Sequence, residues 1–176
     1  MSEERRKRCL EYKNENDRML LIASDMLVKT VISEATGEDK NRIVMRKNDK
    51  GKPYIEGISV NFNFSHSGDF VVLAVNRNHP VGVDIEKIRP VKKRLIDRVC
   101  TEKEKEFVYG KTSFDGQCLS DKNMQERFFR IWTYKEAKLK CTGQGISDDL
   151  KLTEYSETGC FQRVFDDFCV TVVTET

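Results

Sequence analysis

The chain has 176 residues, of which 38% are hydrophobic and 34% charged, which is typical of one polar globular domain or two small packed halves. Its 31 basic residues nearly balance 29 acidic ones, so the net charge of +2 gives no reason to expect nucleic acid as a partner. The six cysteines form no C-x-x-C pair, only two histidines are present, and no apolar run is long enough to span a membrane. We therefore expect a reduced, cytoplasmic protein without a zinc site, a disulfide scaffold or a membrane segment.

The first third of the chain is predicted to be mainly helical. Residues 2–18 are highly charged and helix-prone, and 19–32 carry apolar side chains at helical spacing, which indicates a buried amphipathic helix. Residues 36–42 (TGEDKNR) break this pattern, and 48–57 (NDKGKPYIEG) have the composition of a turn.

Strands are predicted in the middle of the chain. Residues 60–64 alternate, 65–69 (SHSGD) indicate a turn, and 70–75 (FVVLAV) indicate a buried strand, so we expect a hairpin. A second turn at 76–80 leads to 81–87 (VGVDIEK), where apolar and other residues alternate strictly. This strand is predicted to turn its aliphatic side chains to a core and both of its acids to the opposite face.

The last part combines helices with a closing pair of strands. One charged helix is predicted over 91–109, a polar loop over 110–125, and a long helix over 125–141 with an apolar stripe. Residues 142–149 (TGQGISDD) end that helix, and 160–165 and 168–173 are predicted strands. Helices and hairpins in separate runs favour an α+β fold over a parallel βαβ sheet.

Two carboxylates on one face of the 81–87 strand call for an explanation. The Cα atoms of Asp84 and Glu86 should lie about 6–7 Å apart, so two ionised side chains would repel by about 2–3 kcal/mol at an effective dielectric near 20. A bound Mg²⁺ would reverse this cost, because it prefers hard carboxylate oxygens. A solvated strand face with Lys87 nearby is the simpler alternative.

The 125–141 helix offers a third carboxylate. At about 100° per residue, Glu136 and Lys140 fall at the edge of the apolar stripe that includes Trp132. Such a pair could supply a metal ligand and a phosphate contact, or it could be an ordinary surface pair at i, i+4.

Four motifs in order resemble a known family. GKPY (51–54), FNFSHSGD (62–69), GVDIEKIRP (82–90) and IWTYKEAKLKCTGQGI (131–146) are similar to motifs of 4'-phosphopantetheinyl transferases of the longer single-chain type, which activate peptide and polyketide synthases. The resemblance implies Mg²⁺-dependent transfer of the phosphopantetheine arm of coenzyme A to a serine of an acyl or peptidyl carrier protein, with release of 3',5'-ADP. Mn²⁺ is a possible substitute.

The same resemblance implies roles for particular residues. Asp84, Glu86 and Glu136 would hold the metal, Lys140 would pair with a phosphate oxygen, and Glu136 could also accept the serine proton. Further contacts to coenzyme A would come from Gly51, Lys52 and Pro53 at the adenine end, Ser65 and His66 at the phosphates, and Arg5, Arg8 and Arg18 at the 3'-phosphate.

The resemblance also implies an architecture. We expect a monomer whose two similar α+β halves, 1–79 and 80–176, form a pseudo-dimer with coenzyme A between them. The first half would carry one wall of the coenzyme A site and would lack its initial strand, and the second would carry the metal and catalytic residues.

Two other functions are compatible with parts of the pattern. An acidic pair with a Glu-Lys helix is also found in Mg²⁺-dependent phosphodiester nucleases, although that function leaves GKPY and SHS unexplained. A module that binds coenzyme A or a carrier protein without turnover is the second alternative.

Overall fold

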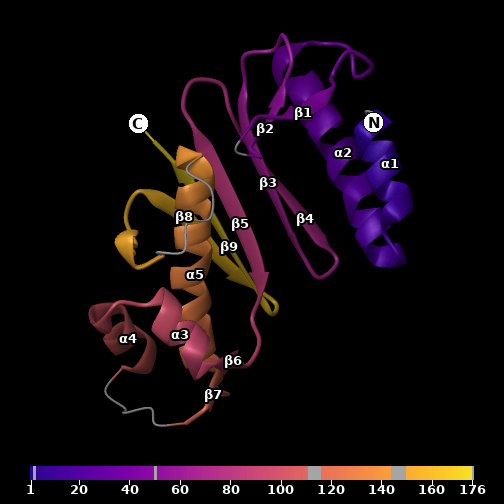
Figure 1. Cartoon of the computed structure of the whole chain (residues 1–176). Helices are drawn as coiled ribbons and strands as arrows, with labels where there is room; N and C mark the ends of the chain where they lie inside the picture. The colour runs from indigo at the N-terminus through magenta and orange to yellow at the C-terminus, as the bar shows by residue number, and fades with distance from the viewer. Residues whose placement is uncertain (2, 50, 111–115, 144–149, 176) are drawn as a thin grey trace.

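The computed structural model describes residues 1, 3–49, 51–110, 116–143 and 150–175. It has mixed helices and antiparallel strands, which confirms the α+β prediction (Figure 1). The helices are α1 (Glu3–Glu11), α2 (Glu15–Thr36), α3 (Lys93–Val99), α4 (Glu102–Tyr109), α5 (Lys122–Thr142) and the 3-10 turn η1 (Leu150–Leu152). The strands are β1 (Met45–Lys47), β2 (Pro53–Ile55), β3 (Asn61–Ser67), β4 (Phe70–Asn76), β5 (Val81–Lys87), β6 (Val91–Lys92), β7 (Cys118–Leu119), β8 (Cys160–Phe165) and β9 (Phe168–Thr174).

In the N-terminal half of the chain, the long helix α2 packs against the β3-β4 hairpin (Figure 1). The Asn14 side chain caps the start of α2 by accepting from the Asn16 amide, and Gly37, with φ of 79°, ends the helix in the left-handed conformation. Val28 and Ile32 of α2 reach the core of this half, where they pack with Phe62 of β3. The short β1-β2 pair joins the same core.

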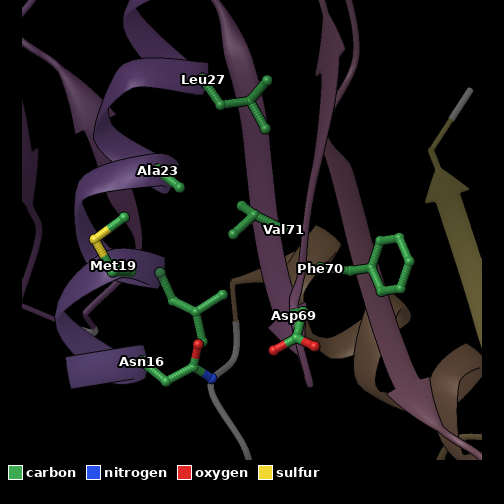
Figure 2. A pocket seen from close by; sticks show the side chains of 8 residues that line it. Asn16, Met19, Ala23, Leu27, Asp69, Phe70 and Val71 are labelled. Atoms are coloured by element: carbon green, nitrogen blue, oxygen red, sulfur yellow. The ribbon is translucent and has the colours of Figure 1, made fainter. Parts of the chain in front are cut away.

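An apolar groove of about 470 Å³ remains between α2 and the tip of the β3-β4 hairpin. Figure 2 shows Val71 directed toward α2, whereas the neighbouring Phe70 points to the other side of the strand, as alternation on a strand requires. Phe70 meets the rings of Phe165 and Phe168 from the β8-β9 hairpin in edge-to-face contacts. The tip of one hairpin thus touches the tip of the other.

The C-terminal half of the chain is built on a three-stranded antiparallel sheet with the order β5-β9-β8. Helix α5 lies along this sheet, and α3 and α4 pack near the N-terminal end of α5 (Figure 1). The main core of the half contains Phe128 and Ile131 from α5 together with Ile96, Val99 and Val108 from α3 and α4. In the described residues the β3-β4 sheet has two strands, one fewer than the β5-β9-β8 sheet.

Both faces of β5 are covered, which argues against the simpler alternative of a solvated face around its two acids. Val81 and Val83 pack with Ala74 of β4 across the contact between the halves, as the alternation predicts for a core-facing side. The other face carries Gly82 and Asp84 and lies against α5, and the Asp84 residue is only 4% exposed. The strand therefore lies between helix α5 and the other half of the protein.

The outer edge of β5 meets side chains of β3 instead of a paired strand. Asn63 Oδ1 accepts from the Val83 amide at 3.0 Å, and Ser67 Oγ accepts from the Lys87 amide at 3.0 Å. Between them, the Ser65 hydroxyl donates to Asp84 Oδ1 at 2.8 Å. These three contacts form a polar seam between the halves. Two of them provide acceptors for strand amides, and the Val83 amide would otherwise be buried without a partner.

Several predicted boundaries were wrong. The helix predicted over 91–109 is two helices, because Thr101 and Glu104 form a capping box that starts a new helix after Cys100. Residues 65–67 belong to β3, which limits the turn to the two residues before β4, and α5 begins three residues earlier than predicted. The sequence also did not predict β1, β2, β6 or β7. Parts of the predicted loops, 111–115 and 144–149, lie outside the described residues.

Among the described residues, no helix has the length and apolar character that crossing a lipid bilayer demands.

The contact between β5 and α5 requires glycine at position 82. A Cβ atom added to Gly82 would stand 2.0 Å from the Ala137 carbonyl oxygen and 2.5 Å from the Cys141 amide nitrogen. We expect Gly82→Ala to lower the free energy of unfolding by about 3 kcal/mol or more, because helix backbone cannot give way as a side chain can. Urea unfolding followed by circular dichroism measures this.

Gly57→Ala is the matched control for Gly82→Ala. Gly57 has φ of 77°, and a Cβ atom added to it would have nothing within 4 Å. Gly57→Ala should therefore lower the free energy of unfolding by about 1 kcal/mol, through the left-handed backbone conformation alone. Equal losses for the two variants would show that the close approach of β5 and α5 is not a packing constraint.

Candidate active site

A buried group of charged side chains lies where α5 crosses β5. Glu136 is 6% exposed and Lys140 follows one turn later, so both residues reach the Gly82–Asp84 face of the strand. Lys140 Nζ stands 2.6 Å from Asp84 Oδ1 and donates to Ser65 Oγ at 3.2 Å. The structure therefore brings together four of the residues that the sequence singled out.

The Asp84 carboxylate is only partly satisfied. Its Oδ1 atom receives both Lys140 and Ser65, whereas Oδ2 is buried and has no hydrogen-bond partner in the described structure. Burial raises the pKa of Asp84, and the nearby Lys140 ammonium opposes that rise. A buried oxygen without a partner is costly, so Oδ2 is a free acceptor for a cation.

Glu136 has the electrostatic character of a second acceptor. Burial is the largest cause of its raised pKa, the charge of Asp84 adds to it, and Lys140 lowers it. A buried carboxylate whose pKa is raised both by burial and by a neighbouring carboxylate is a common feature of functional sites.

Glu86, at the exposed end of β5, is turned to other partners. Its Oε1 atom accepts from the Trp132 indole at 3.3 Å, and its Oε2 atom pairs with Arg89 at 3.1 Å. The predicted trio is thus not gathered: among the described side chains, no three acids, histidines or cysteines are close enough to hold a metal ion together.

The residues present nevertheless fit a hard divalent cation. The unpartnered Asp84 Oδ2 and the buried Glu136 carboxylate are the oxygen donors that Mg²⁺ prefers, and Glu86 lies two residues along the same face of β5.

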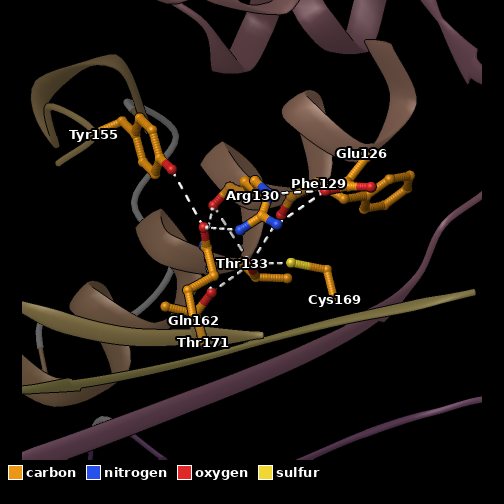
Figure 3. A network of polar contacts seen from close by, with 8 residues as sticks. All are labelled: Glu126, Phe129, Arg130, Thr133, Tyr155, Gln162, Cys169 and Thr171. Carbon is orange, nitrogen blue, oxygen red and sulfur yellow. Dashed lines mark hydrogen bonds and ion pairs between the residues drawn. The ribbon is translucent and has the colours of Figure 1, made fainter. Parts of the chain in front are cut away.

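A hydrogen-bonded network anchors α5 to the sheet behind Asp84 (Figure 3). Thr171, the cross-strand neighbour of Asp84, shares a hydrogen bond of 2.7 Å with Thr133 of α5 and accepts from Gln162 Nε2 at 2.7 Å. Gln162 in turn accepts from Arg130 at 3.1 Å. These bonds fix α5 on β9 one turn before Glu136, so they set the position of that carboxylate.

A separate pocket of about 410 Å³ contains further predicted residues. Its lining comes from α1, α2, β1, β3 and the segment after α1, and consists of Arg5, Arg8, Tyr12, Asp17, Leu21, Ser24, Lys47, Phe64 and His66. His66 points here from β3 while its neighbour Ser65 faces Asp84, because strand residues alternate. The prediction that His66 lies in a turn was wrong. Lys47 was missed, since it belongs to no recognised motif.

The predicted arginines differ in their surroundings. Arg5 is 8% exposed and pairs with Asp25 at 3.2 Å while donating to Ser24, so its guanidinium is bound to α2. Arg8 is exposed at the rim of the pocket, near the Tyr12 ring. Arg18 does not line the pocket.

The GKPY segment contacts the C-terminal end of α5. Lys52 Nζ donates to the Cys141 carbonyl oxygen at 2.9 Å, and its side chain lies beside Gly143. A cation there complements the negative end of the helix dipole. Gly51 and Pro53 flank Lys52 at the start of β2. The carbonyl that Lys52 contacts belongs to Cys141, the residue that follows Lys140.

Lys135, in the same motif as Glu136, has a structural place. It is fully buried, donates to the Val99 carbonyl oxygen at 2.8 Å and pairs with Glu104 at 2.7 Å. Glu104 also accepts from the Tyr155 amide, so this ion pair ties α3 and α4 to α5.

Comparison with known proteins matches both halves of the chain. Residues 80–166 match the model of the 4'-phosphopantetheinyl transferase superfamily, and residues 1–78 match that of the 4'-phosphopantetheinyl transferase N-terminal domain. The chain belongs to the 4'-phosphopantetheinyl transferase superfamily. The four motifs therefore indicated the family correctly.

Relatives within the superfamily come from bacteria and animals. The chain is 32% identical to 4'-phosphopantetheinyl transferase Sfp of Bacillus subtilis over 149 residues, which are 84% of the chain and 62% of that protein. It is 29% identical to the transferase gsp of Aneurinibacillus migulanus over 146 residues, 83% of the chain and 57% of that protein. A Xenopus laevis relative, L-aminoadipate-semialdehyde dehydrogenase-phosphopantetheinyl transferase, is 30% identical over 86% of the chain and 52% of its own length. The chain thus spans between half and two thirds of these relatives.

The raised pKa of Glu136 predicts how stability depends on pH without metal. An acid whose pKa is higher in the folded than in the unfolded chain stabilises the fold at low pH, and that contribution falls as pH rises from its ordinary value of 4.5 through the folded pKa. We expect Glu136→Gln to be more stable than the wild type above this range and to match it below. Urea unfolding in EDTA from about pH 4 to about pH 8 tests this.

Glu106→Gln, a substitution at an exposed position of α4, is the control for Glu136→Gln. Its free energy of unfolding should stay close to that of the wild type over the whole pH range. A Glu136→Gln variant that is less stable than the wild type at the upper end of the pH range would contradict the burial argument.

Proposed function

We propose that this protein transfers the phosphopantetheine arm of coenzyme A to a serine of an acyl or peptidyl carrier protein and releases 3',5'-ADP. The observation that carries this proposal is the buried Asp84 Oδ2 acceptor beside Glu136 and Lys140, at the family's motif positions. Membership of the superfamily supports the reaction class. It gives no support to the nuclease alternative.

Each charged residue of the buried group has a proposed task. Asp84 and Glu136, joined by Glu86, would hold Mg²⁺ or Mn²⁺, which supplies Lewis-acid stabilisation of the leaving diphosphate when bound. Lys140, half-exposed and already bound to one carboxylate oxygen, is placed to pair with a phosphate oxygen as well. The pairing would orient the diphosphate and offset its charge.

The transfer itself needs a proton acceptor. The carrier serine oxygen would form a bond to the phosphorus that bears the pantetheine arm, and the bond from that phosphorus to 3',5'-ADP would break. Glu136 would take the serine proton, directly or through water, since its raised pKa makes it a better base than an ordinary carboxylate.

The pocket around Arg8, Lys47 and His66 is the proposed site for the 3'-phosphate end of coenzyme A. Its basic side chains suit an anion, and β3 separates it from Asp84 by the thickness of one strand. Lys52, Gly51 and Pro53 would contact the adenine. The division at 79–80 into a coenzyme A-binding half and a metal-holding half remains a prediction.

We further propose a monomer in a reducing compartment such as the cytoplasm. All six cysteines are free thiols, which that environment preserves. Carrier protein and coenzyme A are the proposed partners, without nucleic acid or membrane.

The intact mass of an apo carrier protein, incubated with purified protein, coenzyme A and Mg²⁺, tests the proposed function. We expect a gain of one phosphopantetheine, and at least a hundred-fold slower gain (about 3 kcal/mol) with Asp84→Asn, because a metal ligand and the Lys140 partner are lost together. A folded protein that modifies none of several carriers would refute transfer, and coenzyme A binding without turnover would favour the binding module.

Arg8 should contribute to coenzyme A binding through the 3'-phosphate. We expect Arg8→Ala to raise the KM for coenzyme A about ten-fold with little change in kcat, which corresponds to one charge-assisted contact. Steady-state kinetics with coenzyme A and with 3'-dephospho-coenzyme A measure the two KM values. The increase in KM should vanish with 3'-dephospho-coenzyme A, which lacks the phosphate.

Arg6→Ala is the control for Arg8→Ala, since Arg6 is also an exposed α1 arginine but does not line the pocket. An equal effect of Arg8→Ala on both substrates would place the 3'-phosphate elsewhere.

A further inference from the structure

Both oxygens of the Glu86 carboxylate are bonded to donors that do not belong to the group formed by Asp84, Glu136 and Lys140. Trp132 of α5 donates its indole N–H to Oε1, and Arg89 pairs with Oε2, three residues along the chain. Arg89 also donates to the Lys87 carbonyl oxygen at 3.0 Å, and its guanidinium lies 5.3 Å from the centre of the Phe129 ring. The arginine is therefore attached at three points, of which Glu86 is only one.

This arrangement explains why the three acids do not form a ready metal site. Asp84 and Glu136 are buried beside each other, while Glu86 has both oxygens engaged on the outer side of the group. A cation that used Glu86 would face the positive charge of the Arg89 guanidinium at Oε2, whereas the Trp132 indole at Oε1 is neutral.

We propose that Arg89 acts as an internal counter-ion that holds Glu86 away from the metal site until a divalent cation displaces it. The inference rests on the metal site of the proposed function. It assigns a positioning role to Arg89, a residue of the GVDIEKIRP motif for which the resemblance implied no role.

The ion pair is weak enough to be displaced. The Glu86 side chain is 23% exposed and that of Arg89 is 56% exposed, so water screens their attraction. After release, the guanidinium keeps its contacts with the Lys87 carbonyl and the Phe129 ring, so the arginine does not have to leave the surface of the half.

Trp132 makes this displacement observable. It is the single tryptophan of the chain, and its indole N–H is bonded to the carboxylate that has to move. Cation binding at Glu86 should therefore change the tryptophan fluorescence of the protein without any substrate present.

The test compares divalent cation binding by wild type, Arg89→Gln and Arg89→Lys, each without coenzyme A. Free Mn²⁺ is measured by electron paramagnetic resonance, and Mg²⁺ is titrated against tryptophan fluorescence. Removing the competing charge should tighten Mn²⁺ binding by about five-fold in Arg89→Gln. Arg89→Lys keeps the charge and should stay within about two-fold of the wild type.

Arg94→Gln is the matched control, since it removes the same charge from an exposed position of α3 that lies near Arg89 but has no contact with Glu86 in the described structure. It should bind Mn²⁺ as the wild type does. Equal or weaker Mn²⁺ binding by Arg89→Gln, an equal gain in Arg94→Gln, or no saturable binding by any variant would overturn the proposal.

This measurement is independent of transfer to a carrier protein. Failure of transfer with the Arg89→Gln effect intact would reject the proposed function alone, and transfer without that effect would reject only the counter-ion.

Discussion

Three elements of the molecule meet at the Asp84 carboxylate. Strand β5 provides the acid, α5 provides Lys140, and β3 of the other half provides Ser65. Removing the partners of a buried carboxylate leaves its charge uncompensated, which is more costly than the loss of a surface pair. The same contact therefore joins the two halves and holds the candidate catalytic residues in place.

The site is held rigidly at a cost to stability. Gly82 lets α5 touch β5, and the bond between Thr133 and Thr171 fixes the helix on the sheet. Within that frame Asp84 and Glu136 are kept buried although burial raises the pKa of each. Groups kept against their solvation preference in this way are characteristic of functional sites, where binding of a ligand relieves the strain.

Much of this could be predicted from the sequence, because the motifs are local. Alternation in VGVDIEK predicted β5, and helical spacing predicted that Glu136 and Lys140 lie at the edge of the apolar stripe of α5, where they meet that strand. The features that could not be predicted depend on tertiary contacts. They are the burial of the second face of β5, the ion pair between Arg5 and Asp25, and the ion pair between Glu86 and Arg89. Capping at Thr101 and the short strands were missed because their signals extend over only a few residues.

The polar seam between β3 and β5 has a mechanical consequence. A continuous hydrogen-bonded ladder would lock the two sheets into one stiff unit, whereas here single side chains, Asn63, Ser65 and Ser67, bridge the gap. Such bridges bend more easily than backbone pairing does. A ligand that contacted both halves could therefore change the angle between them through small rotamer changes, without breaking the backbone hydrogen bonds of either sheet.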